Sequence, residues 1–327
     1  MEALLTQQWI GDRGIDVRDE ASLTLVREAI RALGARDELV DRAVLVASEL
    51  GRNHLRHARF GEIAVRAIDR GIEIVAVDRG LGLTDVSAAL DAAPRPRGSL
   101  GVGVSSVRRL ASEVDIDVRL FEGTCFIARV LERDVPRRRE VGVYGRPYPG
   151  EHVSGDHALF VRTDDALVLA VCDGLGHGPA ARAAADAAMR YFVEHAGAAP
   201  ATLLEGAHQA LVGTRGVVMA ALRATATELE VASVGNVDVQ VVAPRSVRRF
   251  GGSSAVVGGR PGPVKPRGET AALAPDDVIV MSTDGLTSKL SIEHDYPLLR
   301  AHPVAIAQRI LERFGRDNDD GLVLVAR

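Results

Sequence analysis

Four groups of acidic residues between positions 154 and 320 each stand beside an apolar segment. Asp173 follows the run 167–171 in the turn CDGLGHG, and the other groups are SGD at 154–156, STDG at 282–285 and DNDD at 317–320. Short apolar runs bounded by glycine and polar residues are typical of buried strands. Because the ends of several strands can meet at one rim of packed sheets, we expect these carboxylates to converge. The candidates are Asp156, Asp173, Asp284 and Asp319.

The chemistry that suits such a cluster is the binding of hard divalent cations. Carboxylates, the carbonyl of Gly174 and water are oxygen ligands that fit Mg²⁺ or Mn²⁺ better than Zn²⁺, and the sequence has no cysteine and histidine set at zinc spacing. Two cations held together would lower the pKa of a bound water and clamp phosphate oxygens. Taken alone, the segment around Asp173 is equally consistent with an ordinary turn between a strand and a helix that begins at Pro179.

The composition is that of an ordinary globular protein of about two domains. The 327 residues are 46% hydrophobic and 26% charged, with a net charge of −4. This balance gives no general attraction to nucleic acid or to an anionic membrane. The sequence shows no leader-like start and no apolar run that approaches the ~18 residues of a membrane span. We therefore expect a cytoplasmic protein that binds neither nucleic acid nor membrane.

The lysine content restricts the kinds of nucleotide site that the chain could hold. The lysines are Lys265 and Lys289, and neither lies in a GxxxxGK loop. A conventional protein kinase also needs a lysine on a strand of its first lobe. Any ATP site must therefore belong to a class that works without one.

Residues 1–135 contain a second set of polar residues at chemically suggestive positions. Helices are expected from Asp19 to Gly34 and over 37–58, and on the second helix Glu49 and Asn53 point from the same face. A strand over 72–77 delivers Asp78 into the sequence DRGLGL. This sequence contains Gly80 and Gly82. Further along, Gly101 and Gly103 open a helix, where free N–H groups favour phosphate oxygens. The last two strands are joined through Glu122 and Gly123, and Thr124 begins the second of them.

These motifs in this order resemble the N box, the glycine boxes and the terminal Gly-Thr of the GHKL ATPases, and most of all the RsbT-type anti-sigma serine kinases. The resemblance implies a Bergerat ATP-binding fold. By it, Glu49 acts as the base toward a serine hydroxyl, Asn53 binds Mg²⁺ on the phosphates, and Asp78 holds the adenine amino group. Gly101 and Gly103 line the phosphate lid. A solvated helix face is the alternative for Glu49 and Asn53.

The polar, proline-containing segment 136–140 is expected to link this domain to a second one at 141–327. In the second domain strands are expected at 141–146, 157–163, 167–172, 217–224, 228–234, 237–242, 270–273, 278–281 and 321–326. Helices are expected at 179–195, 200–211 and 303–314. Strands grouped around helices predict two packed sheets with helices outside. The fold class is thus α+β, with a β-sandwich flanked by helices in the second domain.

The second domain resembles the PPM class of metal-dependent serine/threonine phosphatases, in the branch of stage II sporulation protein E and RsbX. The motifs SGD, CDGLGHG, SVGNVD, STDG and NDDGLVLV carry the resemblance. It implies that Asp173 bridges two Mn²⁺ or Mg²⁺ ions, with the Gly174 carbonyl on one of them. Asp284 and Asp319 complete the second ion and Asp156 supports the pair. Asp320 could exchange roles with Asp319.

The two resemblances together imply a partner-switching regulator. The phosphatase would remove phosphate from phosphoserine or phosphothreonine on STAS-domain proteins, which are anti-anti-sigma factors or stressosome scaffolds. The first domain would bind ATP with Mg²⁺ and phosphorylate the same class of protein, with a sigma factor or its regulator as a further partner. Two alternatives stay open: an ATP-binding domain that only gates the phosphatase, and a pure binding protein with two vestigial sites.

Overall fold

The computed structural model describes residues 14–57, 61–91, 102–244, 246–287 and 289–327. The chain forms two compact units, Met1–Val141 and Gly142–Arg327. Each unit has its own set of strands and its own helices.

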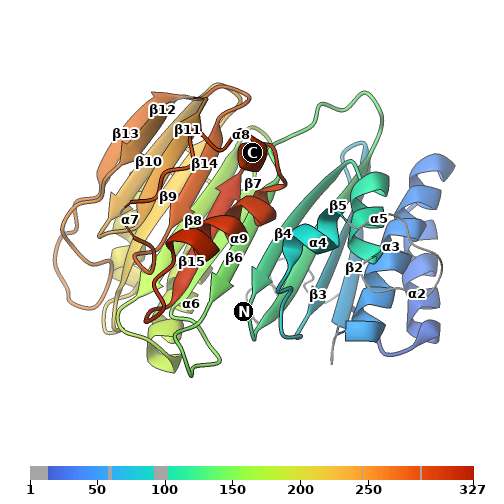
Figure 1. Ribbon diagram of the computed structural model, residues 1–327, viewed down its shortest axis with the longest axis horizontal. Helices are drawn as coiled ribbons and strands as arrows, with labels where there is room; N and C mark the ends of the chain where they lie inside the picture. The colour runs from blue at the N-terminus through green and yellow to red at the C-terminus, as the bar shows by residue number, and fades with distance from the viewer. Residues whose placement is uncertain (1–13, 58–60, 92–101, 245, 288) are drawn as a thin grey trace. The chain divides into compact units, whose positions relative to one another are not determined.

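The first unit places helices on one face of an antiparallel sheet. The sheet order is β1-β2-β3-β5-β4, and α2, α3 and α5 lie on one side of it (Figure 1). Its elements are β1 (Ile15–Asp16), α2 (Glu20–Arg31), α3 (Asp37–His57), β2 (Gly61–Ile68), β3 (Gly71–Asp78), α4 (Val86–Asp91), α5 (Val102–Leu110), β4 (Glu113–Arg119) and β5 (Gly123–Leu131).

Helix α2 begins where the sequence provides a capping group. The side chain of Asp19 accepts a hydrogen bond from the backbone N–H of Ser22 at 2.8 Å and so caps α2. The apolar stripe of α2, which includes Leu23 and Ile30, is buried against the sheet. The predicted helix start at Asp19 is confirmed.

The sheet face away from these helices carries a buried network of charges. Arg129 on β5 donates to Glu73 on β3 at 2.7 Å and to Asp115 on β4 at 2.6 Å, and all three side chains are almost completely buried. A buried guanidinium requires such partners, because an unpaired charge in this position would be strongly destabilising. The network continues into the expected linker, where Arg138 pairs with Glu113 at 2.9 Å. The segment 136–140 is thus bonded to β4 rather than free.

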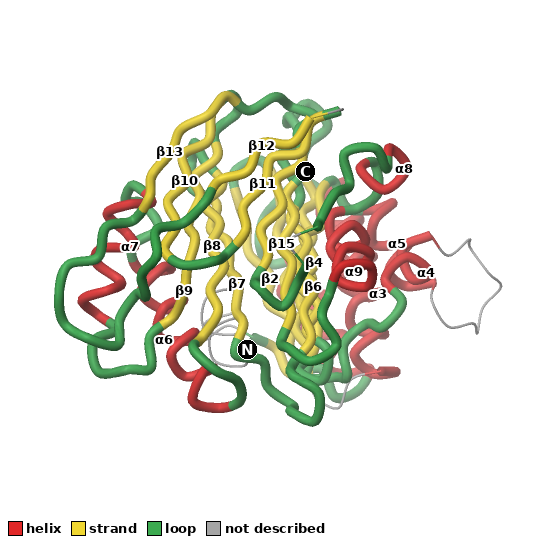
Figure 2. The backbone as a smooth tube through the Cα atoms, turned by 60° about the vertical axis from the view of Figure 1, so that its left-hand side comes forward, coloured by secondary structure: helices red, strands yellow, loops and turns green. Residues whose placement is uncertain are grey.

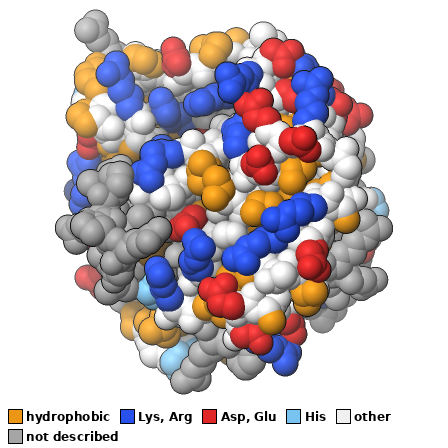
Figure 3. Space-filling model, turned by 90° about the vertical axis from the view of Figure 1, so that its right-hand side faces the viewer, with side chains coloured by type: hydrophobic (Ala, Val, Ile, Leu, Met, Phe, Trp, Pro, Cys, Tyr) orange, Lys and Arg blue, Asp and Glu red, His pale blue; other side chains and the backbone are white. Residues whose placement is uncertain are grey.

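Charged side chains of both signs are mixed over the side of the molecule that bears α2, α3 and α5 (Figure 3). Exposed large apolar side chains occur there too, among them Leu25 on α2 and Leu45 on α3. The mixing agrees with the small net charge of the whole sequence.

The second unit is a sandwich of two antiparallel sheets. One sheet has the order β13-β10-β9-β8-β7, and the strands of the other follow the order β6-β15-β14-β11-β12. Helices α6 and α7 lie outside the first of these sheets and α9 lies outside the second (Figure 2). The strands are β6 (Val141–Arg146), β7 (Asp156–Arg162), β8 (Leu167–Gly174), β9 (Val217–Ala224), β10 (Glu228–Val234), β11 (Asp238–Ala243), β12 (Ser246–Phe250), β13 (Arg267–Ala272), β14 (Val278–Ser282) and β15 (Gly321–Ala326). The helices are α6 (Pro179–Glu194), α7 (Pro200–Ala210), α8 (Tyr296–Leu299) and α9 (Pro303–Phe314).

The expected two-sheet architecture of this unit is confirmed, with a few differences in its elements. Strand β8 runs on through Asp173 to Gly174, because these residues pair with Val218 and Val217 of β9. Strand β12 was not predicted, since its sequence SVRRF contains two adjacent arginines and only Phe250 is buried. Among the described residues, no helix is long and apolar enough to cross a lipid bilayer.

Candidate functional site

Two of the expected carboxylates lie side by side at one end of the sheet that contains β7 and β8. Asp156 begins β7, Asp173 lies near the end of β8, and the two residues are direct partners in the antiparallel register. Asp156 is only 2% exposed. The turn that follows Asp173 is held to the start of β7, because the N–H of Gly174 donates to the Gly155 carbonyl at 3.2 Å.

The other sheet contributes Asp284 through the residues that follow β14. The hydroxyl of Thr283 donates to the Asp156 carboxylate at 2.7 Å and accepts from the backbone N–H of Leu322 at 3.1 Å. This hydroxyl therefore links the ends of β7, β14 and β15. Asp284 comes next in the chain, and its carboxylate accepts from the Asn236 side chain at 2.7 Å.

The two aspartates before β15 have different surroundings. Asp320 is 4% exposed and accepts hydrogen bonds from the backbone N–H groups of Tyr148 and Gly155, the latter at 2.9 Å. Its oxygens therefore fix the backbone around the site. Asp319 is less buried and lies close enough to Asp284 for the two charges to repel each other. Of the two, Asp319 has the carboxylate that is better placed to bind a ligand.

The carboxylates raise the pKa values of one another. Burial raises the pKa of Asp173 to about 8, and the charges of Asp284, Asp319 and Asp320 add to the shift. Burial and the charge of Asp173 hold the pKa of Asp156 well above its usual value. Such shifts arise when several carboxylates are crowded together in a poorly solvated site.

The donor set fits hard divalent cations whose coordination is completed by water. In the described part of the chain, no three His, Cys, Asp or Glu side chains already form a complete set of ligands for one ion. Mg²⁺ does not require this, because it keeps several waters and binds through one or two carboxylates. A cation between Asp173 and Asp284 would also relieve the repulsion that raises the pKa of Asp173.

The turn after Asp173 has a shape that only glycine permits at certain points. A Cβ atom at Gly174 would overlap the carbonyl oxygen of Ala181 in the first turn of α6. Gly176 and Gly178 have φ values of +86° and +73°, in the region that favours glycine. Pro179 then starts α6, as expected. Gly174 thus lets the end of β8 pack closely against the first turn of α6.

His177 lies in the same turn and is held by two neighbours. Its ring stacks on Tyr148 with centroids 4.5 Å apart, and its Nδ1 lies 3.4 Å from a carboxylate oxygen of Glu151. The charge of His177 also acts to lower the pKa of Asp319. His177 therefore borders the acidic cluster.

In the first unit, Glu49 and Asn53 lie on α3 and are both partly exposed. Glu49 pairs with Arg52 at 2.7 Å. The loop after β3 approaches the end of the same helix, since a Cβ at Gly80 would lie 3.6 Å from the carbonyl oxygen of His57. The chain thus brings the two helix residues and the loop after Asp78 to one end of the unit.

Asp78, which is expected to bind the adenine, has a raised pKa. It pairs with Thr124 of β5 in the sheet, and Gly80 donates its N–H to the carboxylate at 2.7 Å. Burial raises the pKa of Asp78 to about 6. Gly82 has a φ of +78°, and a Cβ there would lie 2.9 Å from the Arg119 carbonyl oxygen. Buried carboxylates with raised pKa values are more frequent at functional sites than elsewhere.

The glycines of the expected phosphate lid are only partly within the described structure. Gly103 lies in the first turn of α5, a helix that packs against α3. Gly101 lies outside the described residues.

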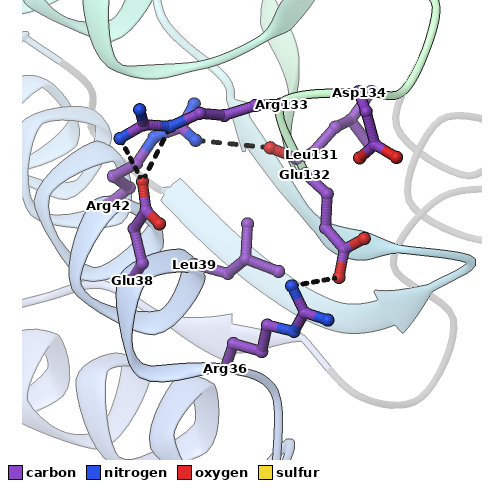
Figure 4. A pocket seen from close by; sticks show the side chains of 8 residues that line it. All are labelled: Arg36, Glu38, Leu39, Arg42, Leu131, Glu132, Arg133 and Asp134. Atoms are coloured by element: carbon purple, nitrogen blue, oxygen red, sulfur yellow. Dashed lines mark hydrogen bonds and ion pairs between the residues drawn. The ribbon is translucent and has the colours of Figure 1, made fainter.

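A separate pocket opens between the start of α3 and the end of β5 (Figure 4). Its volume of about 220 Å³ is below the roughly 300–1,000 Å³ that is usual for small-molecule sites. Its charges are already paired, with Arg133 on Glu38 and Arg36 on Glu132. It lies at the far end of α3 and β5 from Asn53 and Thr124, so it is not part of the expected nucleotide site.

Sequence reasoning missed three polar residues around the acidic cluster. Thr283 and Asn236 orient Asp156 and Asp284, and Arg215 touches the turn after Asp173. Thr283 and Asn236 lie within the motifs STDG and SVGNVD, and these motifs could have identified them as site residues. The sequence contained no comparable signal for Arg215.

Comparisons with known proteins found relatives for both parts of the chain. Residues 163–327 match the family described as Stage II sporulation protein E (SpoIIE). The N-terminal part is 30% identical over 108 residues to the serine/threonine-protein kinase RsbT of Bacillus subtilis (strain 168), which covers 32% of this chain and 81% of that protein.

Similar solved structures cover somewhat more than half of the chain. One, described as "The bacterial stressosome: a modular system that has been adapted to control secondary messenger signaling", is 28% identical with a TM-score of 0.54 and covers 58% of this chain and 100% of the other. RsbX in complex with magnesium is 23% identical with a TM-score of 0.51, over 59% of this chain and 96% of the other, and shows the shared fold. The chain therefore belongs to the SpoIIE family of PPM-type serine/threonine phosphatases and carries an N-terminal region related to the kinase RsbT.

Proposed function

We propose that the second unit uses two Mn²⁺ or Mg²⁺ ions to hydrolyse phosphoserine or phosphothreonine esters on STAS-domain proteins. The observation that carries the proposal is the convergence of carboxylates from the ends of β7, β8 and β14 and from the segment before β15. Family membership supports the phosphatase activity.

Each residue of the cluster has a proposed part in holding the ions. Asp173 would hold both ions, and the Gly174 carbonyl would bind one of them. Asp284 and Asp319 would complete the second, and Asp156 would support the pair directly or through water. The crowding that raises the pKa of Asp173 supports the bridging position, because a cation on each side stabilises the ionised form.

The surrounding residues keep these oxygens in place. The Thr283 hydroxyl orients Asp156 and the Asn236 amide orients Asp284. Asp320 fixes the backbone at residues 148 and 155. When bound, the cations supply an activated water at neutral pH and a clamp on the phosphoryl oxygens.

The class of substrate is proposed from the resemblance to partner-switching phosphatases. A similar structure carries the stressosome in its description, and the N-terminal part is related to RsbT. Both relatives support a STAS-domain protein as the phosphorylated partner, with a sigma factor or its regulator further along the same pathway.

The first unit is proposed to be a GHKL-type domain that binds ATP with Mg²⁺ and phosphorylates the same class of protein. In this proposal Glu49 is the base, Asn53 binds the ion, and Asp78 binds the adenine. Gly80, Gly82, Gly101, Gly103 and Thr124 would shape the nucleotide site. The partly buried carboxylate of Asp78, beside the end of α3, supports nucleotide binding. A second candidate role is a gate that binds ATP and controls the phosphatase without transferring phosphate.

The phosphatase is tested by release of phosphate from a phosphorylated STAS-domain protein in Mn²⁺. The wild-type chain should release it, and Asp173→Asn should reduce the rate at least a hundredfold, as removal of a central catalytic group does. Asp165→Asn is the matched control, because Asp165 is exposed and pairs with Arg223 away from the cluster. Equal rates for wild type and Asp173→Asn would exclude the proposed use of metal.

The first unit is tested with γ-labelled ATP and the unphosphorylated STAS-domain protein. Transfer of label that disappears in Glu49→Ala would support a kinase. Binding of ATP that changes the phosphatase rate without transfer of label would support the gate. A chain that binds neither ATP nor Mn²⁺ would contradict both roles.

A further inference from the structure

The turn between α7 and β9 lies directly beside the turn that follows Asp173. Gly174 at the end of β8 is the register partner of Val217 at the start of β9. One residue further, the N–H of Leu175 donates to the Gly216 carbonyl at 3.2 Å. Arg215 stands just before Gly216 and is thus carried along the edge of the acidic site.

The backbone that presents Arg215 is held firmly by its neighbours. The Thr214 hydroxyl donates to the Leu211 carbonyl at 2.8 Å and accepts from the Gly216 N–H at 3.0 Å. The N–H of Gly213 donates to the Gly259 carbonyl at 3.1 Å. None of these bonds uses the Arg215 side chain, so replacing that side chain should leave the turn intact.

The Arg215 guanidinium is exposed and bonded only weakly. Its Nη1 lies 3.4 Å from the Leu175 carbonyl oxygen, which is long for a hydrogen bond. Among the described residues it has no carboxylate partner, whereas Arg182 pairs with Asp186 at 2.6 Å. A guanidinium has five N–H donors, so most of those on Arg215 are available to a ligand.

The space next to this guanidinium is also kept open. Gly176 has a φ of +86°, and a Cβ there would lie 3.0 Å from Nη1 of Arg215. A larger residue at this position would press on the arginine. The glycine thus leaves room for the guanidinium at the rim of the site.

We propose that Arg215 binds the non-bridging oxygens of the substrate phosphoryl group while that group lies over Asp173. The planar fork of a guanidinium matches two phosphate oxygens, and the positive charge offsets the dianion of a phosphate ester. Leu175, which Arg215 already touches, is two residues from Asp173, a separation of at most about 7 Å. This inference rests on the proposed phosphatase function and adds the residue that binds the substrate's phosphate.

The test uses the full chain, Mn²⁺, p-nitrophenyl phosphate as substrate and inorganic phosphate as a ligand. In Arg215→Ala we expect the KM for p-nitrophenyl phosphate to rise about tenfold. The dissociation constant of inorganic phosphate, measured by calorimetry, should rise by the same factor, because one hydrogen bond to a charged group is lost. Arg215→Lys should recover part of this loss, because it keeps the charge without the fork. The affinity for Mn²⁺ should stay within twofold, since Arg215 is not a ligand.

Arg248→Ala is the matched control, because Arg248 is also exposed but lies on β12. It should bind phosphate as the wild type does. Phosphate binding that is unchanged in Arg215→Ala would overturn the inference, even if Asp173→Asn still abolished hydrolysis and so upheld the proposed function. Wild-type protein that bound Mn²⁺ but neither bound phosphate nor hydrolysed the ester would overturn both.

Discussion

Replacing Asp173 with asparagine should make the metal-free second unit more stable. The side chain keeps its size and its ability to accept a hydrogen bond, but it can no longer ionise. In the wild type, burial and the charges of Asp284, Asp319 and Asp320 oppose ionisation of Asp173 and raise its pKa to about 8. The substitution removes one member of a set of mutually repelling charges.

The size and the pH dependence of this gain follow from the pKa shift. Because the pKa of Asp173 in the folded protein exceeds its ordinary value of 3.8, the folded state binds more protons than the unfolded state between these two pH values. The wild type therefore loses stability as the pH rises from 3.8 to about 8. At 1.36 kcal/mol per pH unit, the asparagine variant gains at most about 4 kcal/mol at pH 7, and close to nothing near pH 4.

Hydrogen exchange of peptides from β7 and β8 in EDTA measures this unit separately from the first. At pH 7, these peptides should be better protected from exchange in Asp173→Asn than in the wild type. The difference between the two proteins should be larger at pH 8. Asp165→Asn should show no gain, because Arg223 lowers the pKa of Asp165 and the carboxylate is favourable there. With Mn²⁺ at about 100 times its dissociation constant, the wild type should gain about 2.7 kcal/mol and the variant less. Equal protection in EDTA at pH 8 would refute the crowding of carboxylates around Asp173.

Three further substitutions test other parts of the structure. Asp78→Asn should weaken ATP binding, measured by calorimetry, at least tenfold. Without nucleotide, the same substitution should stabilise the first unit at pH 7 by at most about 3 kcal/mol, because the pKa of Asp78 is about 6 in the folded protein and ordinarily 3.8. Gly123→Ala should destabilise the first unit by roughly 3 kcal/mol in urea denaturation. The residue has a φ of +132°, and the new Cβ would overlap the Asp78 carbonyl oxygen. Its control, Gly34→Ala, has a φ of +68° and open space around it, so it should cost about 1 kcal/mol. Thr283→Val should lower Mn²⁺ affinity about tenfold or more, because Asp156 loses the hydroxyl that orients it, and unchanged affinity would contradict that role.

Periodicity and capping predicted much of the fold. The bounds of α9 and β6 are as expected from the apolar spacing, and the cap of α2 is the predicted Asp19. Strand β12 could not be found in this way, because its sequence lacks an apolar run and its position at the edge of a sheet leaves Arg248 and Arg249 in solvent. The position of a strand at the edge is a property of the assembled sheet.

The candidate site was predicted in outline and not in detail. Spacing next to apolar runs was enough to select Asp156 and Asp284. It could not separate the roles of Asp319 and Asp320, since these neighbours differ in burial and in hydrogen-bond partners only after folding, when Asp320 meets the backbone N–H groups of residues 148 and 155. The partners of Thr283 and Asn236 lie 127 and 48 residues away, so their roles depend on tertiary structure.

The most direct measurement of the central claim is the anomalous scattering of Mn²⁺ in crystals of the full chain. We predict two peaks about 3.5–4 Å apart, with Asp173 between them and Asp284 and Asp319 beside one. The absence of both peaks at saturating Mn²⁺, or peaks only at sites remote from Asp173, would contradict the account.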